Sequence, residues 1–364
     1  MKMLFLVSHL KSGGSERTVA YLSSYMAQHG FDVTILSLSD DIFYDINSNV
    51  KLITLGIESA ANTTINKYVN AVKRKLKTKA YIKKSHPDVV FCMLPETAKY
   101  ILNLHKKGDF SLITSERNNP AIIKDPKLIA LKNKIFEQSD GIVFQTERAK
   151  EYYPQSIQSK SIVIPNAVGN NLIYSVPRIE KREKKISAIG RLDAQKDYST
   201  LLHAFADVLK VHPDFRLEIF GEGPDAQKIA GLTKELDIEK SVCFKGVQKD
   251  AIVQAANSAC FVLSSAFEGM PNALMEAMAV GLPCVSTDCP NGPSELIVDG
   301  KNGILVPVGD SDSLSAAILR MIEDTAFAES CGQVAKDILN THSVLMIANQ
   351  YAKYIKQKCK GRRK

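Results

Sequence analysis

The chain has 364 residues, 45% of them hydrophobic and 24% charged, and a formal net charge of +8 at pH 7. This composition is typical of a globular protein, and the length favours two domains rather than one. No run approaches the roughly 20 apolar residues that a membrane-spanning helix needs. The first apolar run, residues 3–7, is too short for the core of a signal peptide, so we expect a cytoplasmic protein.

The positive charge is concentrated in two segments. Residues 60–87 hold eight Lys or Arg and no Asp or Glu, and residues 343–364 end in a second basic cluster. A solvated helix face and a frayed tail would explain both without a partner. Nucleic acid is not expected as a partner, because the chain lacks zinc-finger spacing, a helix-turn-helix signature and interleaved aromatic and basic residues. The seven cysteines show no metal-ligand spacing and are expected to be buried, in a reducing compartment.

Short runs rich in β-branched residues alternate with amphipathic segments along the chain. In the first half, strands are expected at 3–8, 33–38, 51–55, 89–94, 112–115, 141–145 and 161–164. The pattern starts again with strands expected at 185–190, 217–220, 242–245, 260–263, 284–287 and 303–306. Strands that alternate with helices form parallel, doubly wound sheets. The sequence therefore predicts an α/β protein with two Rossmann-like domains.

The predicted N-terminal domain covers residues 1–168 and the C-terminal domain covers 169–345. A C-terminal helix and basic tail at 346–364 are expected to cross back toward the first domain. The two domains are expected to face one another across a cleft, with ligands bound at the carboxyl ends of the strands.

Several motifs follow predicted strands. Gly13 and Gly14 follow the first strand, where the missing side chains let the backbone approach a ligand and the next helix offers free N–H groups to an anion. Arg191 and Lys196 follow the first strand of the second domain. Surface solvation explains most Lys and Arg residues. Two cations at this place nevertheless suit a diphosphate whose negative charge grows as a bond to it breaks.

Two glutamates, Glu268 and Glu276, lie eight positions apart. Glu268 is expected in a loop, and Glu276 about one turn into a helix that Pro271 helps to start. Both carboxylates can then face one ligand. A pair at this spacing is common by chance, but chance explains it poorly in this loop-to-helix context.

Taken in order, these motifs resemble family 4 of the retaining glycosyltransferases, which have the GT-B fold. The matching residues are 13–17, Gly190-Arg191-Leu192, Lys196, Gly221-Glu222-Gly223-Pro224, Glu268, Glu276 and Asn291-Gly292-Pro293-Ser294-Glu295. The resemblance covers essentially the whole chain. It implies transfer of a hexose or N-acetylhexosamine, first of all GalNAc from UDP-GalNAc, to a glycan acceptor. That acceptor is expected to be polyprenyl diphosphate-linked, in bacterial surface polysaccharide or glycoprotein glycan synthesis.

The resemblance also implies roles for individual residues. Arg191 and Lys196 would stabilise the departing diphosphate, and Glu268 would lie near the reacting carbon. The residues implied in donor binding are Gly14, Gly221, Gly223, Val247, Met270, Asn272, Ala273 and Glu276, of which Glu276 would accept the ribose hydroxyls. Those implied in contacts to the acceptor or the transferred sugar are Gly13, Glu16, Arg117 and Asn118. Closure of the two domains would complete the site.

One position departs from the family pattern. Many relatives carry a histidine after the strand that matches residues 112–115, whereas this chain has Arg117 and Asn118 in that segment. Either residue could replace the histidine, and the sequence does not choose between them. None of the seven histidines lies in a comparable sequence context, and only His9, directly after the first strand, is well placed for the cleft. A histidine general base is therefore not supported. Retention is then expected from a same-face substitution in which the departing phosphate oxygen takes the proton of the acceptor.

Asp310-Ser311-Asp312 has the spelling of the Asp-x-Asp motif with which other glycosyltransferases hold a metal ion. It precedes a helical run at 313–321, so one Asp is expected to be an N-cap. Because Arg191 and Lys196 can neutralise a diphosphate, we expect no metal and no cofactor beside the donor, which is expected to be a UDP-sugar.

Residues 65–84 are predicted to form a basic amphipathic helix. Its apolar stripe consists of Ile65, Val69, Val72, Leu76 and Ala80, and its cations are Lys67, Lys73, Arg74, Lys75, Lys77, Lys79 and Lys84. The stripe could simply pack on the sheet of the first domain. Alternatively the helix could hold the enzyme peripherally on an anionic inner membrane face, with Lys73, Arg74, Lys75 and Lys77 contacting the membrane or a lipid diphosphate.

Two other functions also fit the predicted architecture. A nucleotide-sugar epimerase would use one substrate only, and a noncatalytic sugar-binding protein would be expected to carry an export signal. Release of nucleoside diphosphate with and without a glycan acceptor distinguishes both from a transferase.

Overall fold

The computed structural model describes residues 1–11, 13–57, 64–105, 108–169, 175–177 and 179–360. The chain forms two compact units: unit 1 is Met1–Ala167 with Val344–Lys364, and unit 2 is Val168–Ser343. The sequence places these divisions one or two residues later, at 168/169 and 345/346. The last helix, α16 (Val344–Lys360), is part of unit 1, and residues 361–364 of the predicted basic tail lie outside the described residues.

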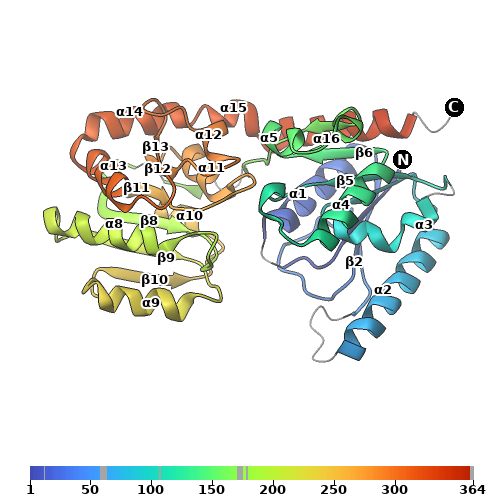
Figure 1. Ribbon diagram of the computed structural model, residues 1–364. Helices are drawn as coiled ribbons and strands as arrows, with labels where there is room; N and C mark the ends of the chain where they lie inside the picture. The colour runs from blue at the N-terminus through green and yellow to red at the C-terminus, as the bar shows by residue number, and fades with distance from the viewer. Residues whose placement is uncertain (12, 58–63, 106–107, 170–174, 178, 361–364) are drawn as a thin grey trace. The chain divides into compact units, whose positions relative to one another are not determined.

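Unit 1 is built on a seven-stranded parallel sheet with the order β3-β2-β1-β4-β5-β6-β7. Its strands are β1 (Lys2–Val7), β2 (Asp32–Ser37), β3 (Lys51–Thr54), β4 (Val89–Cys92), β5 (Ser111–Ser115), β6 (Gly141–Phe144) and β7 (Ser161–Val163). One core lies between this sheet and two helices, α1 (Gly14–Gln28) and α16. Segments from opposite ends of the chain therefore cover the same face (Figure 1).

The other face of the same sheet packs against a second core. The elements that contribute to it are α2 (Thr64–Ser85), η1 (Pro95–Tyr100), α3 (Leu102–His105), α4 (Pro126–Gln138), α5 (Glu147–Glu151) and α6 (Gln155–Gln158). A short helical turn, η2 (Pro120–Ile122), follows β5. The strands β4, β5 and β6 are buried throughout, as expected for a parallel sheet that is covered on both faces.

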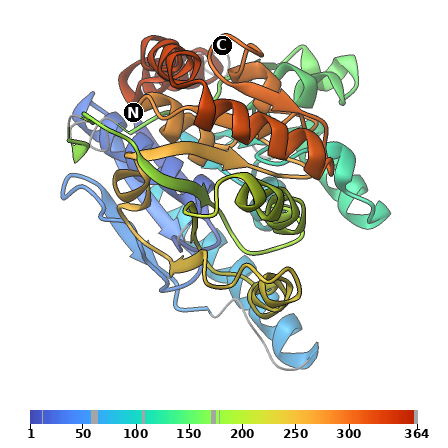
Figure 2. The same cartoon turned by 90° about the vertical axis from the view of Figure 1, so that its left-hand side faces the viewer.

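Unit 2 has a six-stranded parallel sheet with the order β10-β9-β8-β11-β12-β13. Its strands are β8 (Glu183–Ile189), β9 (Arg216–Phe220), β10 (Val242–Gly246), β11 (Ser258–Leu263), β12 (Cys284–Thr287) and β13 (Ile304–Val306). One face is covered by α8 (Tyr198–Val211), α9 (Ala226–Glu235), α13 (Ser311–Glu323) and α14 (Thr325–Ala335). In Figure 2 the yellow-green α8 and the red-orange α13 lie side by side.

The second core of unit 2 lies on the opposite face of its sheet. The helices there are α10 (Ala251–Ala255), α11 (Asn272–Ala279), α12 (Pro293–Leu296) and α15 (Ile338–His342). Each strand expected from the sequence is present, with ends that differ by at most two residues. The prediction of two Rossmann-like α/β domains is therefore confirmed.

The cysteines are only partly buried as expected. Five cysteines are buried, but Cys243 is exposed on the edge strand β10 and Cys359 is half-buried, so the expectation of burial is wrong for Cys243. None of the helices in the described part of the chain combines the length and apolar character needed to span a membrane.

Candidate active site

The loops that follow β8 and β9 are hydrogen-bonded to each other at the carboxyl edge of the unit 2 sheet. Leu192 N donates to Glu222 O at 3.0 Å. A Cβ atom at Gly221 would lie 2.0 Å from Gly190 O, and one at Gly223 would lie 2.2 Å from Leu192 O. No side chain fits at such distances, and Gly221 also has a φ of +139°. The two glycines predicted at the donor site therefore let these loops touch.

Lys196 and Glu268, both predicted to be catalytic, form an ion pair at the same edge. Lys196 Nζ lies 2.5 Å from Glu268 Oε1, and the two side chains are only 16% and 6% exposed. Ser265 Oγ donates to the same oxygen at 2.7 Å, and Gln195 Nε2 donates to the other carboxylate oxygen at 3.2 Å. The loop after β8 and the loop after β11 are also joined directly, because Ala266 N donates to Gln195 O at 2.8 Å. Three donors thus hold a buried carboxylate in one orientation.

Lys196 thus has a protein partner besides the diphosphate that it is expected to bind. A Cβ atom at Gly190 would lie 2.9 Å from Lys196 Cε, so Gly190 provides the space in which the lysine stem lies. The ammonium group is held by Glu268, and a diphosphate would have to share it with that carboxylate. Spacing along the sequence brings both residues to one strand edge, but it does not show that they contact each other.

Arg191 is the more accessible of the two predicted cations. Its side chain is 68% exposed, and its Nε lies 2.5 Å from Asp193 Oδ2. The other oxygen of Asp193 accepts a hydrogen bond from Gln195 N at 3.1 Å. Asp193 therefore fixes one side of the guanidinium while the rest stays accessible to a ligand. Asp193 was not predicted as a site residue, and its only signal in the sequence is a carboxylate two positions after Arg191.

The second glutamate lies on the helix that the sequence predicts. α11 begins at Asn272 directly after Pro271, and Glu276, in its second turn, is half-buried. Met270 is buried, whereas Asn272 and Ala273 are half-buried at the start of the helix. The prediction of a loop-to-helix junction between the two glutamates is confirmed.

Two further loops complete this edge of unit 2. A Cβ atom at Gly292, where φ is +94°, would lie 2.7 Å from Gly269 O, so the Asn291-Gly292 motif packs on the loop that carries Glu268. Val247 is exposed after β10, and Gly246 O accepts a hydrogen bond from Gly221 N at 2.8 Å. All the site residues predicted in unit 2 therefore follow the carboxyl ends of β8, β9, β10 and β11.

In unit 1, the glycine pair and Glu16 lie at the start of α1. Tyr44 Oη donates to Gly13 O at 2.9 Å and accepts from Gly13 N at 3.1 Å. The Glu16 carboxylate lies over Gly13, since a Cβ atom there would come within 2.3 Å of it, and His9 Nδ1 lies 3.4 Å from Glu16 Oε1. Burial raises the pKa of Glu16. Gly14 is the first residue of the helix.

Arg117 and Asn118, the two residues predicted as replacements for the family histidine, differ in their exposure. Arg117 is buried, and its guanidinium donates to Thr18 Oγ1 at 3.0 Å, to Tyr351 Oη at 3.3 Å and to Asn166. Its side chain thus points into unit 1 toward α1 and α16 and is not accessible to a sugar. Asn118 is exposed, so it is the one of the two that can reach a ligand.

Glu116, which was not predicted as a site residue, anchors the segment after β5. Its carboxylate lies 2.7 Å from Lys132 Nζ and accepts from Tyr153 Oη at 2.9 Å. It also accepts from the backbone N–H groups of Arg117 and Asn118. The buried ion pair of Glu116 with Lys132 therefore fixes the backbone of the segment after β5.

The Asp-x-Asp spelling is explained by helix capping. Asp310 Oδ1 accepts from Ser313 N at 2.9 Å at the start of α13, which confirms the predicted N-cap. The hydrogen bonds from Ser313 lower the pKa of Asp310. Within the described ranges, no three His, Cys, Asp or Glu side chains gather as metal ligands would.

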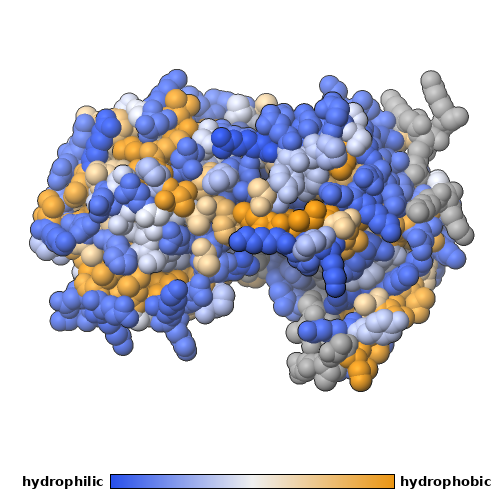
Figure 3. Space-filling model, viewed as in Figure 1, coloured by the Kyte–Doolittle hydropathy of each residue, from blue (hydrophilic) through white to orange (hydrophobic). Residues whose placement is uncertain are grey.

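The basic helix predicted at 65–84 is α2, but it packs differently from the simpler of the two expectations. The apolar stripe faces away from the sheet, with Ile65 75% and Leu76 62% exposed. Tyr68, Val69 and Val72 are exposed beside them. The opposite side of the helix, with Thr78 and Ile82, is the buried one. Packing of the stripe on the sheet is therefore ruled out, and Figure 3 shows hydrophobic side chains along α2.

The four cations singled out on α2 do not share one environment. Lys73 and Lys75 are exposed, and at 100° per residue they flank the apolar stripe. Arg74 is half-buried and points to the other side of the helix. Lys77 is exposed and donates to Leu55 O at 3.0 Å. Lys73 and Lys75 are thus the cations placed to act together with the stripe.

Two Rossmann-like units with glycine-rich loops at the strand ends are the architecture of the GT-B glycosyltransferases. Residues 12–170 match the profile described as Glycosyltransferase Family 4, and residues 172–338 match the profile described as Glycosyl transferases group 1. The chain belongs to the family 4-like GT-B glycosyltransferases, so it is a transferase.

Two curated relatives illustrate the range of similarity. One is named as an N-acetylgalactosamine-N,N'-diacetylbacillosaminyl-diphospho-undecaprenol 4-alpha-N-acetylgalactosaminyltransferase from Campylobacter jejuni. It is 26% identical over 97% of this chain and 99% of its own length. The other is an exopolysaccharide phosphotransferase from Streptomyces coelicolor, 33% identical over 58% of this chain. The match spans only 23% of that second relative.

Solved structures show the same fold. Sucrose-phosphate synthase from Thermosynechococcus elongatus has a TM-score of 0.85 at 19% identity, covering 98% of this chain and 99% of that one. HepE from Anabaena in complex with UDP has a TM-score of 0.80 at 17% identity, covering 98% and 100%.

Proposed function

We propose that the chain is a retaining glycosyltransferase that moves N-acetylgalactosamine, or a related hexose or N-acetylhexosamine, from a UDP-sugar to a polyprenyl diphosphate-linked glycan. Its products would enter a bacterial surface polysaccharide or a glycoprotein glycan. The observation that carries the proposal is the buried Lys196–Glu268 pair beside the exposed Arg191 at the carboxyl edge of the unit 2 sheet. The name of the Campylobacter relative supports the sugar and the lipid-linked acceptor, and the UDP in the HepE structure supports the nucleotide.

The chemistry follows from where the charges lie. Arg191 and Lys196 provide two positive charges for the diphosphate, and electrostatic stabilisation of a leaving group accelerates a reaction when its charge grows in the transition state. Glu268 is an acceptor with both oxygens already oriented by donors, so its negative charge can favour the positive charge that develops at the sugar carbon.

The proposed reaction breaks the bond between that carbon and the diphosphate oxygen and forms one to the acceptor oxygen on the same face. The departing oxygen takes the acceptor proton. The two protein cations take the place of a metal ion, so no metal and no further cofactor is part of this proposal.

The lipid-linked acceptor would be reached through α2. The exposed residues Ile65, Tyr68 and Leu76 form an apolar edge that can enter the boundary of a bilayer, and Lys73 and Lys75 flank it. Each cation near an anionic surface contributes about 1 kcal/mol. The proposed location is therefore the cytoplasmic face of an anionic membrane, with peripheral binding through this helix.

The reaction is tested by incubating the full chain with UDP-GalNAc and a polyprenyl diphosphate-linked glycan, with GDP-sugars as the control donors. We expect mass spectrometry to find a glycan one N-acetylhexosamine longer, and NMR to find an α-linkage. A β-linked product would contradict retention, and an epimerised nucleotide sugar without a longer glycan would favour the epimerase instead.

The membrane surface is tested separately with vesicles of phosphatidylglycerol and phosphatidylcholine. Replacing Lys73, Arg74, Lys75 and Lys77 with glutamine, or Ile65 and Leu76 with serine, should weaken vesicle binding and slow transfer to the lipid-linked acceptor. Transfer to a soluble acceptor should stay unchanged. Substitution of Lys249, an exposed cation on unit 2, is the matched control. If vesicle binding and lipid-acceptor activity survive in both variants, α2 is not a membrane surface.

A further inference from the structure

Among the described residues, no carboxylate forms an ion pair with the buried guanidinium of Arg117, which is only 7% exposed. Its acceptors, Thr18 Oγ1, Tyr351 Oη and Asn166 Oδ1, are all neutral. Its Nε atom meets no acceptor within the described ranges, and the neighbouring Glu116 pairs with a lysine instead. Burying a charge without a counter-charge costs free energy. Stability alone therefore does not explain an arginine at this position.

Thr18 connects this guanidinium to the start of α1. Arg117 Nη2 donates to Thr18 Oγ1 at 3.0 Å, and Thr18 Oγ1 in turn donates to Gly14 O at 2.9 Å. A threonine hydroxyl can rotate and has one proton to donate. Because the guanidinium is a donor to the hydroxyl oxygen, that proton is directed to the Gly14 carbonyl. A bond from a helical threonine to the carbonyl four residues earlier often bends the helix. The two hydrogen bonds, here called the Arg117–Thr18 relay, thus set the direction of the first turn of α1.

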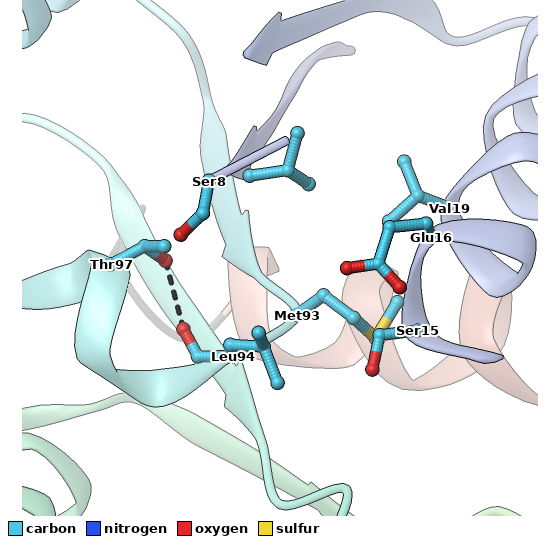
Figure 4. A pocket seen from close by; sticks show the side chains of 8 residues that line it. Ser8, Ser15, Glu16, Val19, Met93, Leu94 and Thr97 are labelled. Atoms are coloured by element: carbon cyan, nitrogen blue, oxygen red, sulfur yellow. Dashed lines mark hydrogen bonds between the residues drawn. The ribbon is translucent and has the colours of Figure 1, made fainter. Parts of the chain in front are cut away.

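The first turn of α1 faces a small pocket at the carboxyl edge of the unit 1 sheet. Ser15 and Glu16, which follow the glycine pair, line this pocket, and in Figure 4 the Glu16 carboxylate points into it from α1. Gly13 is the N-cap of the helix and has no side chain to cap it, but Tyr44 Oη holds its backbone N–H and carbonyl. The glycine turn is therefore fixed at two points, by Tyr44 at the first glycine and by the relay at Gly14.

Arg117 belongs at the same time to the segment after β5. Its backbone N–H and that of Asn118 donate to the Glu116 carboxylate at 3.1 and 3.3 Å, and Asn118 is exposed. We propose that Arg117 is a positioning residue, whose guanidinium fixes the glycine turn of α1 relative to Asn118 without touching a substrate. The inference rests on the proposed glycosyltransferase function. It assigns to Arg117 a contribution to the turnover of bound substrates, beyond its contribution to the fold.

The test removes the middle of the relay. Thr18→Val deletes the hydroxyl at nearly constant side-chain volume, and Thr18→Ser keeps it. Ser23→Ala is the matched control, because the Ser23 hydroxyl is also buried in α1 and donates to a helix carbonyl, Ala20 O, at 3.0 Å. We measure kcat and KM for transfer from UDP-GalNAc to the lipid-linked glycan, well below the melting temperature of each variant. Thr18→Val should lower kcat about ten- to a hundredfold with a smaller change in KM, since a displacement of about 1 Å costs about a hundredfold. Thr18→Ser and Ser23→Ala should keep the wild-type kcat.

Arg117→Lys keeps the charge but not the planar fork, so it should lose kcat as Thr18→Val does. The double variant should be no slower than Arg117→Lys, because both substitutions break one relay. Thermal stabilisation by UDP shows that each variant is folded, and a merely structural role would lower the melting temperature while leaving kcat unchanged. A wild-type kcat in Thr18→Val, an equal loss in Thr18→Ser or Ser23→Ala, or additive losses in the double variant overturns the inference alone. Absence of UDP release by the wild type from every donor overturns the proposed function as well.

Discussion

Replacing Lys196 with methionine should reduce both activity and stability, whereas replacing Arg191 with methionine should reduce activity alone. The difference comes from the surroundings of the two cations. Lys196 is mostly buried and paired with a buried carboxylate, but Arg191 is largely exposed and pairs with Asp193 at the edge of a loop.

The expected size of each effect follows from this geometry. A hydrogen bond to a charged group contributes about 1.5–3 kcal/mol, and removing one partner of a fully buried ion pair costs about 3–5 kcal/mol. Glu268 keeps its hydrogen bonds from Gln195 and Ser265, so we expect Lys196→Met to cost about 2 kcal/mol of unfolding free energy. An exposed pair such as Arg191–Asp193 contributes about 0.2–1 kcal/mol. Loss of a contact to the diphosphate should slow transfer roughly ten- to a hundredfold in both variants.

The assay pairs urea unfolding with the initial rate of UDP release, and Glu268→Gln supplies the double-mutant cycle with Lys196→Met. We expect a coupling free energy of about 1–2 kcal/mol between these two substitutions. Equal stability of the Lys196→Met and Arg191→Met variants, or additive effects in the cycle, would show that the buried pair does not hold this edge of unit 2 together.

Three further predictions concern single features of the two units. Glu276→Ala should lower kcat/KM roughly ten- to a hundredfold with thermal unfolding unchanged, and near-normal rates would remove Glu276 from the site. Activity should persist in excess EDTA, and a strict need for Mn²⁺ or Mg²⁺ would show that the protein cations are not sufficient. Burial raises the pKa of Glu16 above 4.5 in the folded protein, so the folded state favours the protonated carboxyl. The free energy of unfolding that this carboxyl contributes is therefore present below pH 4.5 and is lost as pH rises through the folded pKa. Glu16→Gln should therefore unfold at higher urea concentration than the wild type at pH 7 but not at pH 4, and the opposite order would contradict the burial of this carboxylate.

The fold could be predicted because its signal is local and repeated. Runs such as 89–94 and 260–263 are apolar on both faces of the strand, and alternation with amphipathic helices leaves a parallel sheet as the arrangement that buries them. The glycines at 221 and 223 could be recognised from their motif, but the reason for them, contact with the backbone of the preceding loop, depends on the tertiary structure.

The parts that the sequence could not supply are contacts between residues distant along the chain. Pairing of Lys196 with Glu268, and the inward direction of Arg117 toward Thr18 and Tyr351, involve separations of 72, 99 and 234 positions. The orientation of α2 was left open by the sequence for another reason. A narrow apolar stripe fits either a sheet or a membrane, and which face is buried depends on the neighbours rather than on the periodicity of the helix itself.

In the proposed reaction, the strand edge of unit 2 activates a nucleotide sugar for transfer to a glycan. The most direct measurement is the rate of UDP release from UDP-GalNAc with and without the polyprenyl diphosphate-linked glycan, in excess EDTA, for the wild type and for Arg191→Met. We expect release that depends on the glycan and falls roughly ten- to a hundredfold in the variant. Release that is independent of the glycan, or equal in the two proteins, would contradict the claim.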